Sequence, residues 1–302
     1  MRLTPKATAL LAMLSALVVV LAGCSTSPAR PADGKVSIVA STDVWGDVAK
    51  QIGGTDVTVT SIITDPAQDP HSYEANARVQ LALSKADIVI ENGGGYDDFV
   101  TTLLKGAHNG DATILNAVDI SGFAQDSTLN EHVWYDFPTV KKVAARIAAE
   151  LSTLDSAHAA RFAANQKTFD AALGALEGEE AALKAGAGEG AGVAITEPVP
   201  LYLLTASGLV DETPAEFSEA IEEGRDVAPD ALEKTLRLFS AHRVKLLVYN
   251  EQTGGPETDQ VIAAAKAAGT PMVPVSETLP KSTDYLTWMS DNLAALKAAL
   301  TK

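Results

Sequence analysis

The chain has 302 residues, 46% of them apolar and 21% charged, which suits a folded protein of about two domains. Its 23 basic and 39 acidic side chains give a net charge of −16, which makes nucleic acid and anionic membrane surfaces poor partners. A single cysteine excludes an intramolecular disulfide and a cysteine-rich metal site. An acidic protein of this kind is better suited to bind a small cation than an anion.

The N-terminal segment has the layout of a secretory signal. Arg2 and Lys6 precede an uncharged apolar run at residues 7–22, which is shorter than the roughly 20 residues of a membrane-spanning helix. The run ends in Leu-Ala-Gly-Cys, and its last residue is the only cysteine of the chain, Cys24. This tetrapeptide resembles the bacterial lipobox, whose cysteine is lipidated after cleavage, and the alternative is a plain signal peptide. We predict a lipoprotein signal peptide and a lipid (palmitate) anchor at Cys24.

Short β-branched runs then alternate with helical patterns in two regions. Such alternation with short connections predicts parallel α/β units, in which helices cover the faces of the sheets. In the first region we expect strands at 36–40, 57–63, 88–92 and 113–115, and helices at 45–52, 78–84 and 98–105. In the second region we expect strands at 192–195, 244–249 and 271–275, and helices at 229–242, 257–268 and 283–300.

A long helical stretch at residues 155–184 lies between the two regions. Its larger apolar residues fall on one helical face: Phe162, Phe169, Leu173, Leu176 and Leu183. It could be one more layer element, but its length and central position favour a connector. We therefore predict an α/β fold of two lobes, each a mostly parallel sheet flanked by helices, joined by one long connecting helix. The predicted division is a signal peptide at 1–23, a flexible tether at 24–34, an N-terminal lobe at 35–154, the connecting helix at 155–187 and a C-terminal lobe at 188–302.

Four loops carry polar side chains that could form a site. Open α/β sheets bind ligands at the carboxyl ends of their strands, so the loops after the strands are the place to search. His71 lies in Asp-Pro-His-Ser-Tyr-Glu, and a loop histidine that stands alone is usually just solvated. The other three candidates are His132 in His-Val-Trp-Tyr-Asp, Glu197 in Ile-Thr-Glu-Pro and Glu277 in Ser-Glu-Thr.

DPHSYE followed by HVWYD resembles the metal-binding lipoproteins of bacterial zinc and manganese ABC importers, the TroA/PsaA-like (cluster A-I) solute-binding family. STDVWGDVAKQIGG at 41–54 is similar to the family's opening strand and helix, and ADIVIENGGG at 86–95 to a later pair. ITEPVPLYLLTASGL and SETLPKSTDYLTWMSDNL resemble the segments that supply the third and fourth ligands. The resemblance covers essentially the whole mature chain, with the motifs in family order.

The resemblance implies a metal site of His71, His132, Glu197 and Glu277. Two neutral imidazoles and two carboxylates neutralise one divalent cation, and they would hold zinc at about 2.0–2.2 Å. Two of these ligands come from each predicted lobe, so an ion in the cleft would draw the lobes together. We expect one divalent transition-metal ion, Mn²⁺ or Zn²⁺, as the ligand.

The sequence departs from the family pattern in three places. Asn130-Glu131 precedes His132 where the family often has Asp-Pro, and Glu277 stands where aspartate is common. The His-rich acidic loop of many zinc-specific members is absent. Its absence and the carboxylate at Glu197 favour manganese, although zinc should bind at least as tightly by the Irving–Williams order. The sequence does not decide between Mn²⁺, Zn²⁺ and Fe²⁺.

Several other polar and aromatic residues are expected to lie outside the metal site. Trp134 and Trp288 are expected to pack beneath it, with Asp136 as a supporting or capping group. Asn250 and Glu251 follow a strand, and whether either contributes to the site is left open. We expect three histidines to be exposed: His108, His158 and His242. We expect five glutamates on helices to be solvated: Glu177, Glu179, Glu180, Glu222 and Glu223.

We expect a substrate-binding protein of an ABC importer, lipid-anchored at the extracytoplasmic face of the cell membrane. It would capture the metal ion and deliver it to an ABC permease driven by an ATPase, as a monomer and without catalysing a reaction. One alternative is a secreted zinc hydrolase, which four protein ligands and the lack of an HExxH pattern argue against. Another is a siderophore- or corrinoid-binding protein of the same fold, which the few aromatic residues disfavour. The sequence identifies neither the permease nor any additional role as an adhesin.

Overall fold

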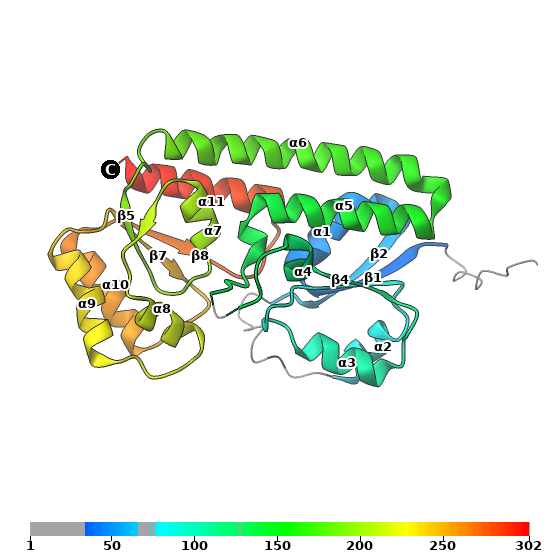
Figure 1. The fold of residues 1–302 in the computed structure, drawn as a ribbon, viewed down its shortest axis with the longest axis horizontal. Helices are drawn as coiled ribbons and strands as arrows, with labels where there is room; N and C mark the ends of the chain where they lie inside the picture. The colour runs from blue at the N-terminus through cyan, green and yellow to red at the C-terminus, as the bar shows by residue number, and fades with distance from the viewer. Residues whose placement is uncertain (1–33, 66–72, 74–75, 127, 302) are drawn as a thin grey trace, which may run out of the picture. The chain divides into compact units, whose positions relative to one another are not determined.

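Two four-stranded parallel sheets, one in each lobe, form the framework of the described part of the chain (Figure 1). The computed structural model describes residues 34–65, 73, 76–126 and 128–301. The N-terminal sheet has the order β2-β1-β3-β4 and the C-terminal sheet the order β6-β5-β7-β8. The strands are β1 (Val36–Thr42), β2 (Val57–Ile63), β3 (Ile88–Glu91), β4 (Thr113–Asn116), β5 (Gly192–Ile195), β6 (Val210–Asp211), β7 (Leu246–Asn250) and β8 (Met272–Val275).

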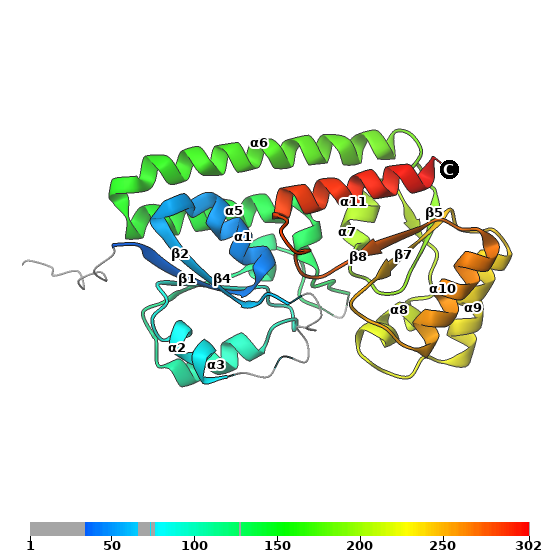
Figure 2. The ribbon, with the colours of Figure 1, turned by 180° about the vertical axis from the view of Figure 1, so that it is seen from behind.

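Helices cover both faces of each sheet, as Figures 1 and 2 show. Those of the N-terminal lobe are α1 (Asp43–Gly53), α2 (Ala77–Leu83), α3 (Phe99–Ala107), α4 (Ala117–Ser121) and α5 (Phe137–Leu154). Those of the C-terminal lobe are α7 (Leu201–Ala206), α8 (Ala215–Glu222), α9 (Pro229–Ser240), α10 (Pro256–Ala268) and α11 (Tyr285–Leu300). This arrangement confirms the predicted α/β class with two helix-flanked parallel sheets.

The strand β1 illustrates why a β-branched run forms a central strand here. Successive side chains of a strand point to opposite faces of the sheet. Val36 and Ile38 accordingly join the core under α1 and α5, while Val39 joins a separate cluster on the other face with Val89 and Val100. Both faces are therefore buried, which is typical of parallel sheets and accounts for the continuous apolar run.

The helix α6 (Ala159–Lys184) is 26 residues long and runs beside both lobes in Figures 1 and 2. It packs against α1 and α5 of the N-terminal lobe and α11 of the C-terminal lobe. All five apolar residues of the predicted stripe are buried in a core that includes residues of both sheets. The helix begins at Ala159, four residues later than predicted, and a 3-10 turn at Ser156–His158 precedes it. The long helix is thus packed into the shared core along its length, which opposes large movements of one lobe against the other.

One residue of α6 contradicts the expectation that its glutamates are solvated. Glu180 is only 6% exposed and falls between Leu176 and Leu183 on the buried face. Burial raises the pKa of Glu180 from 4.5 to about 8, and the nearby carboxylates of Glu177 and Asp136 add to the rise. Glu179, in contrast, is exposed as expected. A carboxyl group therefore occupies a core position of this helix.

Several short elements were not predicted from the sequence: β6, α4, α7 and α8. Each has eight residues or fewer, which is too short for a clear apolar period. Among the described residues, no helix has both the length and the apolar character needed to cross a membrane. Cys24, the signal peptide and His71 lie outside the described residues. The predicted division of the chain into segments stays a prediction.

Candidate metal centre

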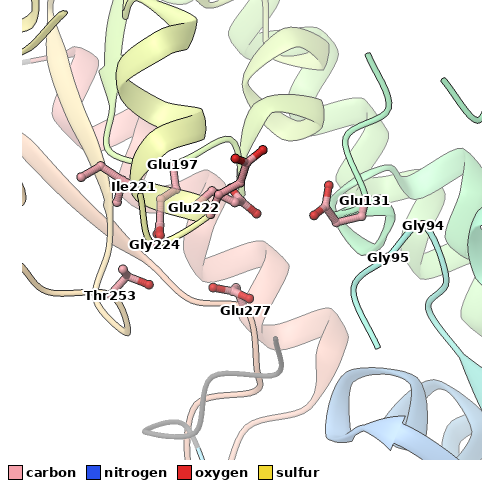
Figure 3. Close-up of a pocket in the computed structure, with 10 residues that line it drawn as sticks. Gly94, Gly95, Glu131, Glu197, Ile221, Glu222, Gly224, Thr253 and Glu277 are labelled. Carbon is pink, nitrogen blue, oxygen red and sulfur yellow. The ribbon is translucent and has the colours of Figure 1, made fainter. Parts of the chain in front are cut away.

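A cavity of about 490 Å³ lies between the loops at the carboxyl ends of the two sheets (Figure 3). Residues from both lobes line it: Gly94, Gly95, Glu131, Glu197, Ile221, Glu222, Glu223, Gly224, Thr253 and Glu277. In Figure 3, Glu197, Glu222 and Glu277 belong to the C-terminal lobe, and Glu131 faces them from the other side. Such a concentration of carboxylates attracts cations and repels anions.

His132 lies fully buried beside this cavity, and Asn130 fixes its protonation. The Asn130 amide donates from Nδ2 to the carbonyl oxygen of Pro198 at 2.9 Å, so its Oδ1 faces His132. That oxygen accepts from the His132 backbone N–H at 3.1 Å and lies 2.7 Å from the ring Nδ1. Because an amide oxygen only accepts, the Nδ1 atom of His132 must carry a proton. In the neutral ring the lone pair is then on Nε2, the nitrogen through which His132 would bind a metal ion.

Aromatic rings hold the plane of the His132 imidazole. Trp134, within the 3-10 turn η3 (Val133–Tyr135), has its ring centre 5.1 Å from that of His132, at an interplanar angle of 69°. The ring of Tyr96 lies 5.9 Å away at 71°. Trp134 is itself buried, which agrees with its expected packing role beneath the site. Asp136 caps the N-terminus of α5 by accepting from the Thr139 backbone N–H at 2.9 Å.

Glu197 lies two residues after the end of β5 and is 4% exposed. The residue after it, Pro198, is the acceptor for the Asn130 side chain, and the hydroxyl of Tyr202 donates to the Asn130 carbonyl at 2.7 Å. Asn130 therefore connects the imidazole of the N-terminal lobe to the Glu197 segment of the C-terminal lobe. Asn130 is one of the positions at which the sequence departs from the family pattern, and these two contacts give it a structural role.

Glu277 follows β8 and is oriented by both of its carboxylate oxygens. Its Oε1 accepts from Asn250 Nδ2 at 2.8 Å, and its Oε2 accepts from the Tyr96 hydroxyl at 3.1 Å. Its backbone N–H donates to Gln252 Oε1. Asn250 thus supports the candidate site by orienting the carboxylate of Glu277, whereas Glu251 is exposed. Tyr96 comes from the other lobe, so Glu277 is held from both sides.

The segment that follows Glu277 is held by the N-terminal lobe. The backbone N–H of Leu279 donates to Asp43 at 3.1 Å, and that of Tyr285 donates to Asp47 at 2.9 Å. The Tyr285 hydroxyl donates to the Trp134 carbonyl at 2.6 Å. Burial raises the pKa of Asp43 to about 6, and the hydrogen bond from Leu279 opposes the rise. Two carboxylates at the start of α1 therefore fix the segment that presents Glu277.

The prediction from the sequence that Glu222 is a solvated charge is wrong. It ends α8, its side chain is only 11% exposed, and its Oε1 lies 3.2 Å from Nε2 of His132. Ligand atoms of Glu222, His132 and Glu131 all lie within 4.8 Å of one another, a grouping that could hold a metal ion. Its neighbour Glu223 is exposed, as expected, and pairs with Arg225.

The Gly93–Gly95 turn borders the cavity in the N-terminal lobe and packs closely against Glu131. Gly94 has a φ of +70°, and a Cβ added there would lie 3.2 Å from the Cβ of Glu131. Asp97 closes the turn by accepting from the backbone N–H groups of Asn92 and Gly93 at 2.6 and 2.8 Å. A residue with a side chain at position 94 would therefore strain the backbone and displace Glu131.

The structure thus brings together three of the four sequence-predicted ligands: His132, Glu197 and Glu277. His71 lies outside the described residues. The sequence reasoning did not place Glu131 and Glu222 at the cavity. Pro214 and Gly224 bracket α8 in the sequence and could have indicated a helix, but they carry no information about which side chain enters the cavity.

The fold and this cavity define a two-lobed binding protein with a cleft lined by carboxylates and a buried imidazole. The family model for the zinc-uptake complex component A, periplasmic (ZnuA), matches residues 38–299. The chain belongs to this family, which confirms the resemblance to metal-binding components of ABC importers.

The relatives agree with this assignment. The chain is 30% identical over 157 residues to the manganese-binding lipoprotein MntA of Bacillus subtilis, covering 49% of this chain and 50% of that protein. It is 25% identical over 239 residues to the iron ABC transporter substrate-binding lipoprotein MtsA of Streptococcus pyogenes, covering 71% and 77%. The chain spans about half the length of the curated relatives such as MntA that it matches.

Solved structures share the fold. A crystal structure of ZnuA superposes with a TM-score of 0.72 at 22% identity, over 88% of this chain and 98% of that one. The binding protein FpvC of Pseudomonas aeruginosa, in complex with Mn²⁺, superposes with a TM-score of 0.73 at 22% identity, over the same shares. At this identity the likeness concerns the arrangement of sheets and helices.

Proposed function

We propose that the protein is the extracytoplasmic substrate-binding component of an ABC importer and captures one divalent transition-metal ion in the cleft. The proposed ligands are His71, His132, Glu197 and Glu277. The observation that carries the proposal is the buried imidazole of His132, whose Nε2 lone pair faces a cavity carboxylate. An imidazole nitrogen and several carboxylates around one small cavity suit a divalent cation and no common anion.

Binding and release, without a chemical reaction, are the proposed mechanism. Family membership supports this function over a zinc hydrolase or a siderophore- or corrinoid-binding protein. Ligands from both lobes would close around the ion, and the permease, driven by its ATPase, would receive it. Because α6 is packed against both lobes, we propose that release needs only a small movement at the cleft.

Manganese is the metal that the donor set favours. Carboxylate oxygens suit Mn²⁺, and the described part of the cavity carries the carboxylates of Glu197 and Glu277. A site that prefers zinc would have more imidazole ligands. Relatives are named for manganese and for iron, and the family is named for zinc. We therefore propose Mn²⁺ as the transported ion, with Zn²⁺ as a tight competitor because of the Irving–Williams order.

Protein expressed without a chelator and purified in metal-free buffers should retain about one equivalent of a divalent transition metal. Elemental analysis by mass spectrometry identifies the ion, and a competition titration with Mn²⁺ and Zn²⁺ ranks the two affinities. Titration with Mg²⁺ is the control, because Mg²⁺ prefers oxygen ligands and near-octahedral geometry. Protein that holds no metal and binds neither Mn²⁺ nor Zn²⁺ contradicts the proposed function.

The anchor is the second part of the proposal. Cleavage at the lipobox-like tetrapeptide would leave Cys24 at the start of the mature chain, where a lipid would hold the protein at the outer face of the membrane. The Cys24→Ser variant should be released into the soluble extracytoplasmic fraction, while the unmodified sequence stays with the membrane. Mass spectrometry of the N-terminal peptide should find diacylglyceryl and acyl mass on Cys24. Wild-type protein with an unmodified Cys24 and no membrane association argues against the anchor.

A further inference from the structure

The contact between Glu222 and His132 brings together an ionised carboxylate and a neutral imidazole, which do not attract each other. The Glu222 carboxylate is an acceptor, and its Oε1 lies 3.2 Å from Nε2 of His132. Asn130 keeps the proton of the neutral imidazole on Nδ1, so the Nε2 lone pair also points at the carboxylate. Two acceptors at this distance are brought together by a cation between them, either a proton or a metal ion.

The distance also fits two ligands of one metal ion. Donors bound at ~2.1 Å stand ~3.0 Å apart at a right angle and ~3.4 Å apart at a tetrahedral angle. The 3.2 Å between Glu222 and His132 lies within that range. Both side chains can therefore bind the same ion with little rearrangement, and they are almost completely buried before it arrives.

Helix stability does not explain why a glutamate occupies position 222 at the end of α8. The C-terminal end of a helix carries a partial negative charge, which favours cations there and disfavours carboxylates. Glu222 and Glu223 nevertheless occupy this end, and the last turn of α8 contains no basic residue. Glu223 reaches Arg225, whereas Glu222 extends into the cavity toward His132. A bound cation would relieve this unfavourable placement.

We propose that Glu222 is a further metal ligand, bound to the same ion as His132 Nε2, and that it selects for manganese over zinc. The inference rests on the proposed function, because it adds one carboxylate to that ligand set. Tetrahedral Zn²⁺ is complete with four ligands and gains little from another oxygen. Mn²⁺ accepts more ligands and prefers oxygen donors, so Glu222 raises its affinity selectively.

The Glu222→Gln variant tests this role because it keeps the size and removes the charge. We expect its dissociation constant for Mn²⁺ to rise by about 10-fold or more, with a smaller rise for Zn²⁺, so that the ratio of the two constants changes. Glu216→Gln is the matched control, since it removes an exposed carboxylate from the same helix outside the cavity. Competition titrations of both variants with Mn²⁺ and Zn²⁺ give the ratio, which the control should leave unchanged.

The visible spectrum of the Co²⁺-loaded wild-type protein gives a second readout that does not depend on the folding of a variant. We expect the weak bands of five- or six-coordinate Co²⁺, which should strengthen in Glu222→Gln as the coordination number falls. Strong tetrahedral-type bands in the wild-type protein, or an unchanged Mn²⁺ to Zn²⁺ ratio in Glu222→Gln, overturn the assignment of Glu222 and leave the proposed function standing. A wild-type protein that binds none of Mn²⁺, Zn²⁺ and Co²⁺ overturns both the assignment of Glu222 and the proposed function.

Discussion

Replacing His132 with alanine should weaken binding of Mn²⁺ and Zn²⁺ by about 1,000-fold, equivalent to roughly 4 kcal/mol. The variant removes the only imidazole nitrogen that the described residues place beside the cavity carboxylates. It also leaves Glu222 facing an empty volume where Nε2 stood 3.2 Å away. Competition with a chromophoric chelator measures the loss, and it should be present for both metals because the nitrogen serves either ion.

Two controls separate ligand loss from a general structural effect. His158→Ala removes a histidine whose side chain is 41% exposed and which pairs with Asp155, so the affinity for metal should not change. His132→Gln keeps most of the side-chain volume, and its thermal unfolding without metal reports whether the buried site still folds. A folded His132→Ala or His132→Gln protein that binds Mn²⁺ and Zn²⁺ as tightly as the wild type excludes His132 as a ligand.

Replacing Glu180 with glutamine should stabilise the protein at alkaline pH and have little effect under acidic conditions. The pKa of Glu180 is raised from 4.5 to about 8, so between these values the folded state binds more protons than the unfolded state. The free energy of unfolding therefore falls as the pH rises through this window, and the full cost is present above pH 8. That cost is at most about 5 kcal/mol, and we expect about 2 kcal/mol after local relaxation.

Urea unfolding at pH 5 and pH 9 measures this effect directly. At pH 5 the protonated carboxyl and the amide are nearly equivalent, so Glu180→Gln and the wild type should have similar unfolding free energies. At pH 9 the variant should be more stable, because it has no charge to bury. Glu179→Gln is the matched control, since its side chain is exposed on the same helix. If the unfolding free energies of Glu180→Gln and the wild type differ equally at both pH values, or do not differ at all, ionisation of Glu180 does not destabilise the folded state.

The architecture was largely accessible from the sequence because it depends on patterns that repeat along the chain. The predicted strands at 57–63 and 192–195 agree with β2 and β5 at every residue. Both are short apolar or β-branched runs bounded by turn residues. The stripe on α6 was read from its spacing, and its apolar members are buried. Glu180 fits the same spacing, four residues after Leu176 and three before Leu183, so the signal for its burial was present but conflicted with the usual exposure of glutamate.

The candidate site was only partly accessible. The rule that ligands bind at the carboxyl ends of strands directed the search to loops, and the family motifs then singled out His132, Glu197 and Glu277. The structure puts all three in or beside one cavity. Glu222 was not predicted because both α8 and the two-residue strand β6 before it are too short to be recognised from the sequence. The supporting role of Asn250 was left open because strand position alone does not say which partner an amide side chain meets.

The sequence by itself determined the α/β class, the alternation of strands and helices, and the loops in which ligands should be sought, because periodicity and turn residues are local properties. It also carries the family motifs, which are read along the chain. Only the tertiary structure decided that Asn130 fixes the tautomer of His132, that Asp43 and Asp47 hold the segment beyond Glu277, and which glutamates are buried. The physical reason is that hydration and charge pairing depend on neighbours brought in from distant parts of the chain.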